Sequence, residues 1–272
     1  MVLTVRRRMV VWALLGAATV PLLAGCREGT VRLSFRPEPG QRLAYRISVH
    51  AITVTTVADE PPRRTTTDTV LVADQRVLEL TPSGGRVEVR LQEEGGAAQT
   101  FVVRLDRAAA VAEVQSIEGL PARALGDLGL SEIFPAAAAA PPDRPLAPGE
   151  RWTIDTAVQV AEGPSSRLRG RGRLVSLGRS EGLDVARVES RYRLPVRQAG
   201  SATENRLSLD GAQTTATEVK YSIDDGTVMA ARARTRGSFE ITLFPPPGIA
   251  GSPVPGTLVV EVTSTTERLS RR

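Results

Sequence analysis

The sequence predicts a mainly β protein in which antiparallel sheets are formed by two pseudo-repeated halves. This arrangement is compatible with a curved open half-barrel, and one short helix is expected near residues 119–133. Val and Thr are abundant and alternate with other residues at a period of two, which is typical of strands. Clusters of Pro, Gly and Asp separate these segments, and the same order of turns and strands occurs twice along the chain.

The first half, residues 31–135, contains strand-like segments followed by a helix-like one. Apolar residues recur at roughly helical spacing over Ile117–Phe134, with Pro121 near the start and Pro135 beyond the end, which favours a short helix. The Ala/Pro-rich stretch 136–147 is expected to be a linker or a long surface loop. Strand alternation occurs at Val31–Phe35, Leu43–Thr55, Thr69–Leu80, Gly85–Gln92 and Thr100–Leu105.

The second half, residues 148–272, follows the plan of the first. Each half opens with Pro-Gly before a strand, a pair in which Gly supplies a positive φ angle. Two last strands are expected at Gly237–Phe244 and Gly256–Leu269, around the loop Pro245–Pro255. The corresponding segments are Pro39–Tyr45 with Pro148–Ile154, Val72–Arg90 with Gly172–Ser190, and Phe101–Glu113 with Glu218–Arg232.

The N-terminus has the order of a secretory signal. Three arginines, Arg6 to Arg8, precede the mostly apolar run Met9–Leu23, so residues 1–25 are expected to be a cleaved signal peptide. The run ends in Leu-Ala-Gly-Cys26, which resembles the lipobox of bacterial lipoproteins and implies that Cys26, the only cysteine, is lipidated. Residues 26–30 then form a short tether. The alternative is a permanent N-terminal transmembrane anchor followed by a buried cysteine.

The chain also resembles a group of uncharacterised bacterial lipoproteins across most of the mature region. The shared features are the lipobox, an early Pro-Gly-x-x-x-x-Tyr strand ending at Tyr45, and a Pro-x-x-x-Leu-x-x-Gly-x-x-Trp segment within Pro141–Trp152. This resemblance implies an extracytoplasmic β-rich domain anchored to the cell membrane by a lipid. It transfers no active site, because its motifs are turns and strand starts. In architecture alone, the predicted long strands with one helix are similar to the half-barrels of bacterial lipoprotein-carrier and lipid-binding proteins.

Composition argues against a nucleic-acid partner. The net charge of +5 falls to +2 once the three leader arginines are removed, so the basic pI reflects the use of arginine rather than a large positive excess. Aromatic residues make up only 4% of the chain, which disfavours stacking platforms for bases or sugars.

The sequence contains no recognisable group of catalytic or cofactor-binding residues. We therefore expect that the protein is not an enzyme and binds no metal or cofactor. Gly178–Gly182 matches Gly-x-Ser-x-Gly, but a nucleophile elbow needs a following helix and a later histidine. A strand follows instead, and the only histidine, His50, lies upstream, so Ser180 is expected to lie in a turn. Asp224 and Asp225 precede a glycine and also indicate a turn.

A ladder of arginines is the most informative polar pattern. Arginines at every second position would share one face of a strand, with Leu and Gly on the other. The expected partner strand, Leu183–Leu194, adds three arginines and one acid, Glu189, to a single face. The ladder is a hypothetical contact for anionic lipid headgroups or an acidic envelope polymer, and the alternative is a solvated face paired with scattered acids. Its members are Arg167, Arg169, Arg171, Arg173, Arg187, Arg191 and Arg193.

These patterns predict a membrane-anchored, non-catalytic binding or cell-envelope structural module. The alternative is a carrier of a lipid or another hydrophobic ligand, with a cavity under a curved sheet. A carrier needs more inward apolar surface than its core fills, whereas a scaffold packs solid.

Overall fold

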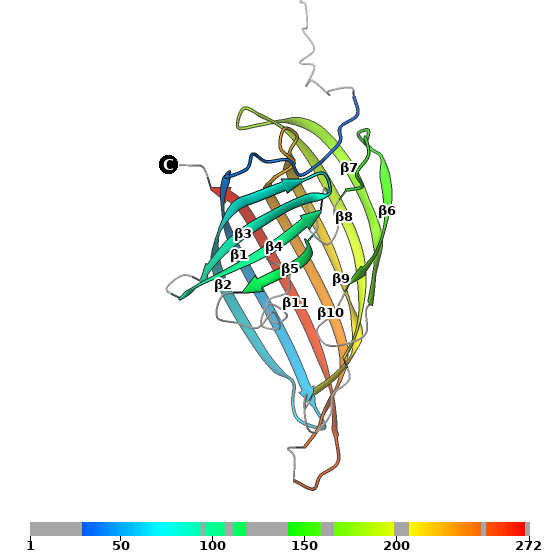
Figure 1. Ribbon diagram of the computed structural model, residues 1–272. Coiled ribbons are helices and arrows are strands. Elements are labelled where there is room, and N and C mark those ends of the chain that lie inside the picture. Colours follow the sequence, from blue (N-terminus) through cyan, green and yellow to red (C-terminus); the bar gives the residue numbers. More distant parts are fainter. Residues whose placement is uncertain are drawn as a thin grey trace, which may run out of the picture.

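The protein folds into one antiparallel sheet of eleven strands (Figure 1). The computed structural model describes residues 29–93, 96–106, 111–117, 141–158, 166–198, 207–245 and 249–269. Within these ranges every regular element is a strand, so the predicted mainly β class is confirmed. The helix expected near residues 119–133 lies outside the described residues.

The strands are mostly long. They are β1 Arg42–Val57, β2 Arg63–Thr81, β3 Gly84–Glu93, β4 Ala98–Asp106, β5 Val111–Ile117, β6 Arg151–Val158, β7 Ser166–Ser180, β8 Leu183–Gln198, β9 Leu207–Ser222, β10 Val228–Leu243 and β11 Val254–Leu269.

The order of the strands joins the two halves of the chain through the last strand. It runs β5-β4-β3-β2-β1-β11-β10-β9-β8-β7-β6, so β11 lies between β1 and β10 while β5 and β6 form the edges. In Figure 1 the strands β3 to β5 pass in front of β10 and β11, which shows that the sheet curls round on itself. The predicted curved, open sheet is therefore confirmed.

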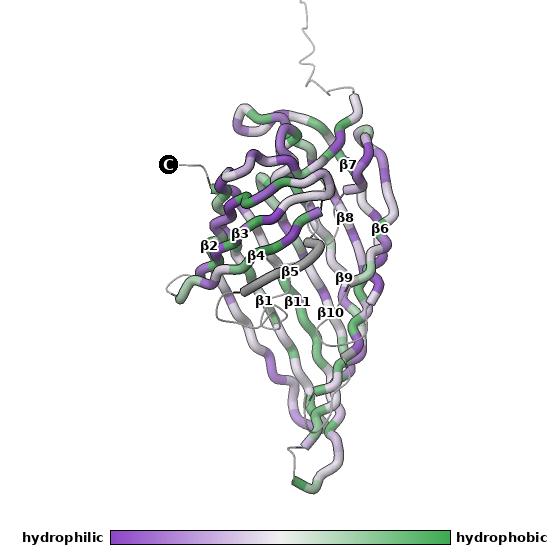
Figure 2. Tube along the Cα trace, viewed as in Figure 1, coloured by the Kyte–Doolittle hydropathy of each residue, from purple (hydrophilic) through white to green (hydrophobic). Residues whose placement is uncertain are grey.

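The inner face of this sheet holds the core. Along β10 the residues from Ala231 to Ile241 alternate between buried and exposed, as expected for a strand with one face in the core. Figure 2 shows hydrophobic and hydrophilic residues alternating along the strands. Two clusters of buried side chains result, one over β6 to β10 around Tyr221 and one over β1 to β4 around Phe101. The arginines of the ladder lie on the opposite, outer face.

The two predicted strand starts are built alike. The amide of Gly40 donates to the carbonyl of Val77 at 2.9 Å, and the amide of Gly149 donates to the carbonyl of Leu174 at 2.6 Å. The two glycines have positive φ angles of 81° and 87°. The amide of Val77 donates in turn to the carbonyl of Gln41, and the amide of Leu174 donates to the carbonyl of Glu150. The pairing of β2 with β3 shifts register directly after Val77, and that of β7 with β8 directly after Leu174.

The segment before β1 differs from the prediction. Val31–Phe35 was expected to be a strand, but only Val31 forms a bridge, with Leu146, so this prediction is wrong in detail. The alternation that suggested a strand has another cause, because Val31, Leu33 and Phe35 are buried in the two core clusters. The end of the expected Ala/Pro linker thus carries a fully buried residue, Leu146.

Candidate anion-binding groove on the outer face

Strand β7 presents arginines on one face and small or apolar residues on the other. Leu168, Gly172 and Leu174 are buried on the inner side. Successive side chains of a strand point to opposite faces, so the residues between them lie outside. The exposed positions are the four predicted arginines of this strand, Arg167, Arg169, Arg171 and Arg173.

The glycines between these arginines are required by the packing of the inner face. A Cβ atom at Gly172 would lie 2.2 Å from Cε2 of Trp152, and one at Gly170 would lie 2.2 Å from the carbonyl oxygen of Arg191. Both distances are far shorter than van der Waals contact. The Arg-Gly alternation of β7 therefore lets Trp152 lie over the strand while the arginines stay outside.

Strand β8 pairs with β7 as predicted and supplies the other side of the ladder. Arg171 lies directly opposite Arg191, and Arg169 lies directly opposite Arg193. Like charges in directly opposed positions destabilise a sheet. Arg187 lies further along β8, beyond a shift of register.

One end of the ladder is neutralised by the edge strand β6. Nε of Arg167 donates to Oδ1 of Asp155 at 2.8 Å, and Nε of Arg169 lies 3.8 Å from the same oxygen. The hydrogen bond from Arg167 lowers the pKa of the Asp155 carboxyl and raises the pKa of Arg167 itself. These two arginines therefore belong to an exposed ion-pair cluster.

Arg187 engages both glutamates of the neighbouring surface. Its Nη2 atom lies 3.2 Å from Oε1 of Glu189, and its Nε atom lies 3.0 Å from Oε1 of Glu218. The other ladder arginines form no ion pair with any described residue, and they are Arg171, Arg173, Arg191 and Arg193.

The structure adds three arginines that sequence reasoning missed. Arg232 and Arg234 of β10 are exposed on the same face, and Arg151 of β6 lies directly opposite Arg173. Their positions follow from the strand order, which no local pattern reveals. A signal was nevertheless present, because Arg232–Arg236 shows the same alternation of arginine as β7.

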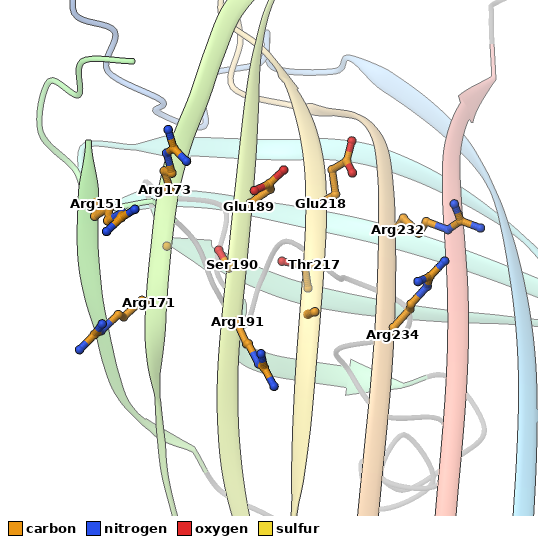
Figure 3. A pocket seen from close by; sticks show the side chains of 12 residues that line it. Arg151, Arg171, Arg173, Glu189, Ser190, Arg191, Thr217, Glu218, Arg232 and Arg234 are labelled. Atoms are coloured by element: carbon orange, nitrogen blue, oxygen red, sulfur yellow. The ribbon is translucent and has the colours of Figure 1, made fainter. Parts of the chain in front are cut away.

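Together these side chains line a groove of about 560 Å³ that crosses β6 to β10 (Figure 3). Its charged residues are six arginines and two glutamates: Arg151, Arg171, Arg173, Arg191, Arg232, Arg234, Glu189 and Glu218. The pairing register arranges part of the groove as a row across β7 to β10 that contains no carboxylate. This acid-free row consists of Arg171, Arg191, Ala216 and Arg234.

On the inner face beneath the groove, three polar atoms have no hydrogen-bond partner among the described residues. They are Nε1 of Trp152, Oγ of Ser190 and Oγ1 of Thr217, and all three residues are buried. Ser190 lies directly opposite Thr217 on the next strand. Each of these atoms is able to donate a hydrogen bond.

The other candidate residues lie apart from the groove. Nδ1 of His50 lies 2.6 Å from Oδ1 of Asp68, its direct partner on β2, and both side chains are well exposed. Ser180 lies at the end of β7, next to a tight turn in which Glu181 and Gly182 have positive φ angles. Asp225 lies in the β9–β10 turn, where it accepts hydrogen bonds from Thr227. Cys26 lies outside the described residues.

Within the described ranges, no three His, Cys, Asp or Glu side chains are grouped closely enough to hold a metal ion. The same part of the chain contains no helix of the length and apolar character needed to cross a membrane. Searches of protein-family models and of curated proteins found no match to this chain.

Proposed function

We propose that the protein is a membrane-anchored, non-catalytic lipoprotein that binds anionic lipid headgroups through its arginine groove. The observation that carries the proposal is the acid-free row, in which arginines on three of four neighbouring strands have no carboxylate partner among the described residues. Guanidinium groups bind phosphate oxygens in bidentate geometry and are only weakly hydrated, which suits them to headgroups.

The magnitude of the attraction is sufficient to matter. Each arginine close to an anionic membrane contributes on the order of 1 kcal/mol. The groove holds six arginines, and its two glutamates are both engaged by Arg187. A basic surface of this size would add to the membrane attachment that a lipid on Cys26 provides.

The first described residues pair with the segment that leads into the groove. Residues 27–30 separate Cys26 from Val31, and Val31 pairs with Leu146 just before β6 begins with the groove residue Arg151. An extended chain spans at most about 3.6 Å per residue. A lipid on Cys26 would therefore hold Val31 within roughly 20 Å of the bilayer surface.

Co-sedimentation with vesicles tests this proposal. A chain beginning at Arg27 contains all eleven strands, so its binding is independent of the lipid anchor. It should sediment with vesicles that contain phosphatidylglycerol and stay in solution with phosphatidylcholine alone. The groove variant Arg171→Gln/Arg191→Gln/Arg234→Gln should lose this binding.

The matched control removes three charges from β2, at Arg63, Arg64 and Arg76, which are exposed far along the sheet. This control should bind like the wild type. If both triple variants lose vesicle binding equally, the binding depends on net charge alone, and the proposal is contradicted. Binding to a soluble acidic polymer but to no vesicle would assign the groove to an envelope polymer instead.

A carrier of hydrophobic ligands is the second candidate. The three unpartnered donors on the inner face favour it, because burying a donor without an acceptor costs about 1–3 kcal/mol. Oxygens of an amphipathic ligand would accept hydrogen bonds from Trp152, Ser190 and Thr217. Native mass spectrometry with lipid extraction on detergent-free protein tests this candidate. A stoichiometric lipid would support the carrier, and a clean apo mass would count against it.

A further inference from the structure

We infer that the groove contains a discrete subsite for one phosphomonoester group, seated over Ala216. This inference rests on the proposed function and refines it, because it replaces general attraction to anions by recognition of a terminal phosphate. A headgroup that ends in a phosphomonoester is the ligand class that it assigns.

Ala216 forms the floor of this subsite. It is exposed on the outer face of β9, with Arg191 directly opposite on β8 and Arg234 directly opposite on β10. Neighbouring strands are about 4.8 Å apart, so the two arginines flank a space roughly 10 Å wide. The methyl group of Ala216 leaves this space open, whereas a long side chain would fill it.

Three arginines of the acid-free row supply the positive charge around this floor. Arg171 lies on the strand beyond Arg191. Figure 3 shows the side chain of Arg191 directed toward β9, that of Arg171 toward β6 and that of Arg234 toward β11, so their guanidinium groups lie apart from one another. Such separation leaves room for an anion between them. A phosphomonoester carries about −1.5 to −2 charge at neutral pH and three acceptor oxygens, so it matches three cationic donors better than a carboxylate or a phosphodiester.

The nearest carboxylates do not compete for these arginines. Glu189 and Glu218 lie in the neighbouring row and contact Arg187 at 3.2 and 3.0 Å. The acid-free row is also hollowed, since it belongs to a groove of about 560 Å³. A hollow with a small residue at its floor holds a discrete group, whereas a flat basic face would serve for surface attraction alone.

Calorimetric titration of the full chain in a neutral detergent tests the subsite. The probes are short-chain phosphatidic acid, short-chain phosphatidylglycerol and inorganic phosphate. Phosphatidic acid should bind about tenfold more tightly than phosphatidylglycerol. Ala216→Glu should weaken its binding by about tenfold or more, and Ala216→Gln, which fills the floor without charge, should also weaken it.

Thr257→Glu is the matched control, because Thr257 is exposed on the outer face of β11, outside the groove lining. It should leave the affinity unchanged. If Ala216→Glu behaves like Thr257→Glu and both lipids bind equally, the subsite is overturned while the proposed function stands. If no anionic lipid binds, both the subsite and the proposed function are contradicted. Inorganic phosphate binding as tightly as phosphatidic acid would confirm the subsite and assign it to a soluble phosphate.

Discussion

Arg171 and Arg191 lie directly opposite one another on the paired strands β7 and β8. No ion pair relieves either side chain in the described part of the chain. A directly opposed pair of like charges opposes sheet formation by about 0.2–1 kcal/mol. A protein that keeps such a pair on an exposed face has retained positive charge where stability alone would favour an acid.

Reversing one of these charges should stabilise the protein and weaken the binding of anions. Arg191→Glu creates a cross-strand ion pair with Arg171, so the free energy of unfolding in urea should rise by about 0.5–1 kcal/mol. The matched control is Arg63→Glu, which faces Thr55 and should have little effect on stability. A lower free energy of unfolding in Arg191→Glu would contradict a destabilising repulsion between Arg171 and Arg191.

The glycine beneath Trp152 is expected to be essential for packing. Gly172→Ala places a methyl group against the indole ring, so overpacking should destabilise the sheet by about 1–3 kcal/mol. In a chain beginning at Arg27, Trp152 is the only tryptophan, and its fluorescence should change. Gly178→Ala is the control, because nothing lies within 4 Å of the added Cβ. Equal effects of the two substitutions would contradict this account of the Arg-Gly alternation.

The two turn glycines should respond alike if the halves are structural repeats. Gly40→Ala and Gly149→Ala each force an alanine into a positive φ angle in open space, at a cost of about 1–2 kcal/mol. Thermal unfolding of both variants measures this cost. A large loss in one variant and none in the other would show that the two strand starts differ in their contribution to stability.

The class of fold could be predicted from the sequence, because alternation with period two is a local signal. For the same reason the face of each arginine on β7 was correctly predicted, as was the pairing of β7 with β8. The groove itself was only partly predicted. Arg234 lies beside Ala216 because β9 and β10 pair in a particular register, and that register depends on the whole sheet.

Alternation was misleading where it arose from packing alone. Val31, Leu33 and Phe35 show the period of a strand because their side chains enter the core. Their backbone is held by one bridge to Leu146 and, further on, by the amide of Arg36, which donates to the carbonyl of Asp225 at 2.8 Å. No sequence pattern distinguishes such a segment from a paired strand.

Stability should fall in acid partly through Asp225. Burial favours a raised pKa for this carboxyl, but hydrogen bonds from the amide and hydroxyl of Thr227 and from Gln41 hold its pKa below the usual value. A lowered folded pKa means that the ionised form stabilises the fold above about pH 4, and that this stabilisation is lost as the pH falls below it.

Asp225→Asn should therefore lower the free energy of unfolding at neutral pH by about 1–2 kcal/mol. The difference from the wild type should shrink as the pH falls below about 4, where the wild-type carboxyl becomes protonated. Urea unfolding at several pH values measures both quantities. A difference that is constant down to strongly acidic pH would contradict the assigned role of the charge.

The expected attachment of the protein to the membrane depends on Cys26. Replacement by alanine should abolish the incorporation of labelled palmitate in an expressing bacterium and release the mature chain from the membrane fraction. Unchanged membrane association together with absent labelling would favour a permanent N-terminal span. Labelling that persists would show that the lipid is carried elsewhere.

Arginine footprinting tests the central claim most directly. The full chain, reconstituted in phosphatidylcholine vesicles with or without phosphatidylglycerol, would be treated with phenylglyoxal, and the modified peptides would be identified by mass spectrometry. Anionic vesicles should protect Arg171, Arg191 and Arg234 while Arg63 and Arg64 remain reactive. Equal modification of both groups of arginines in both kinds of vesicle would contradict binding of anionic headgroups in the groove.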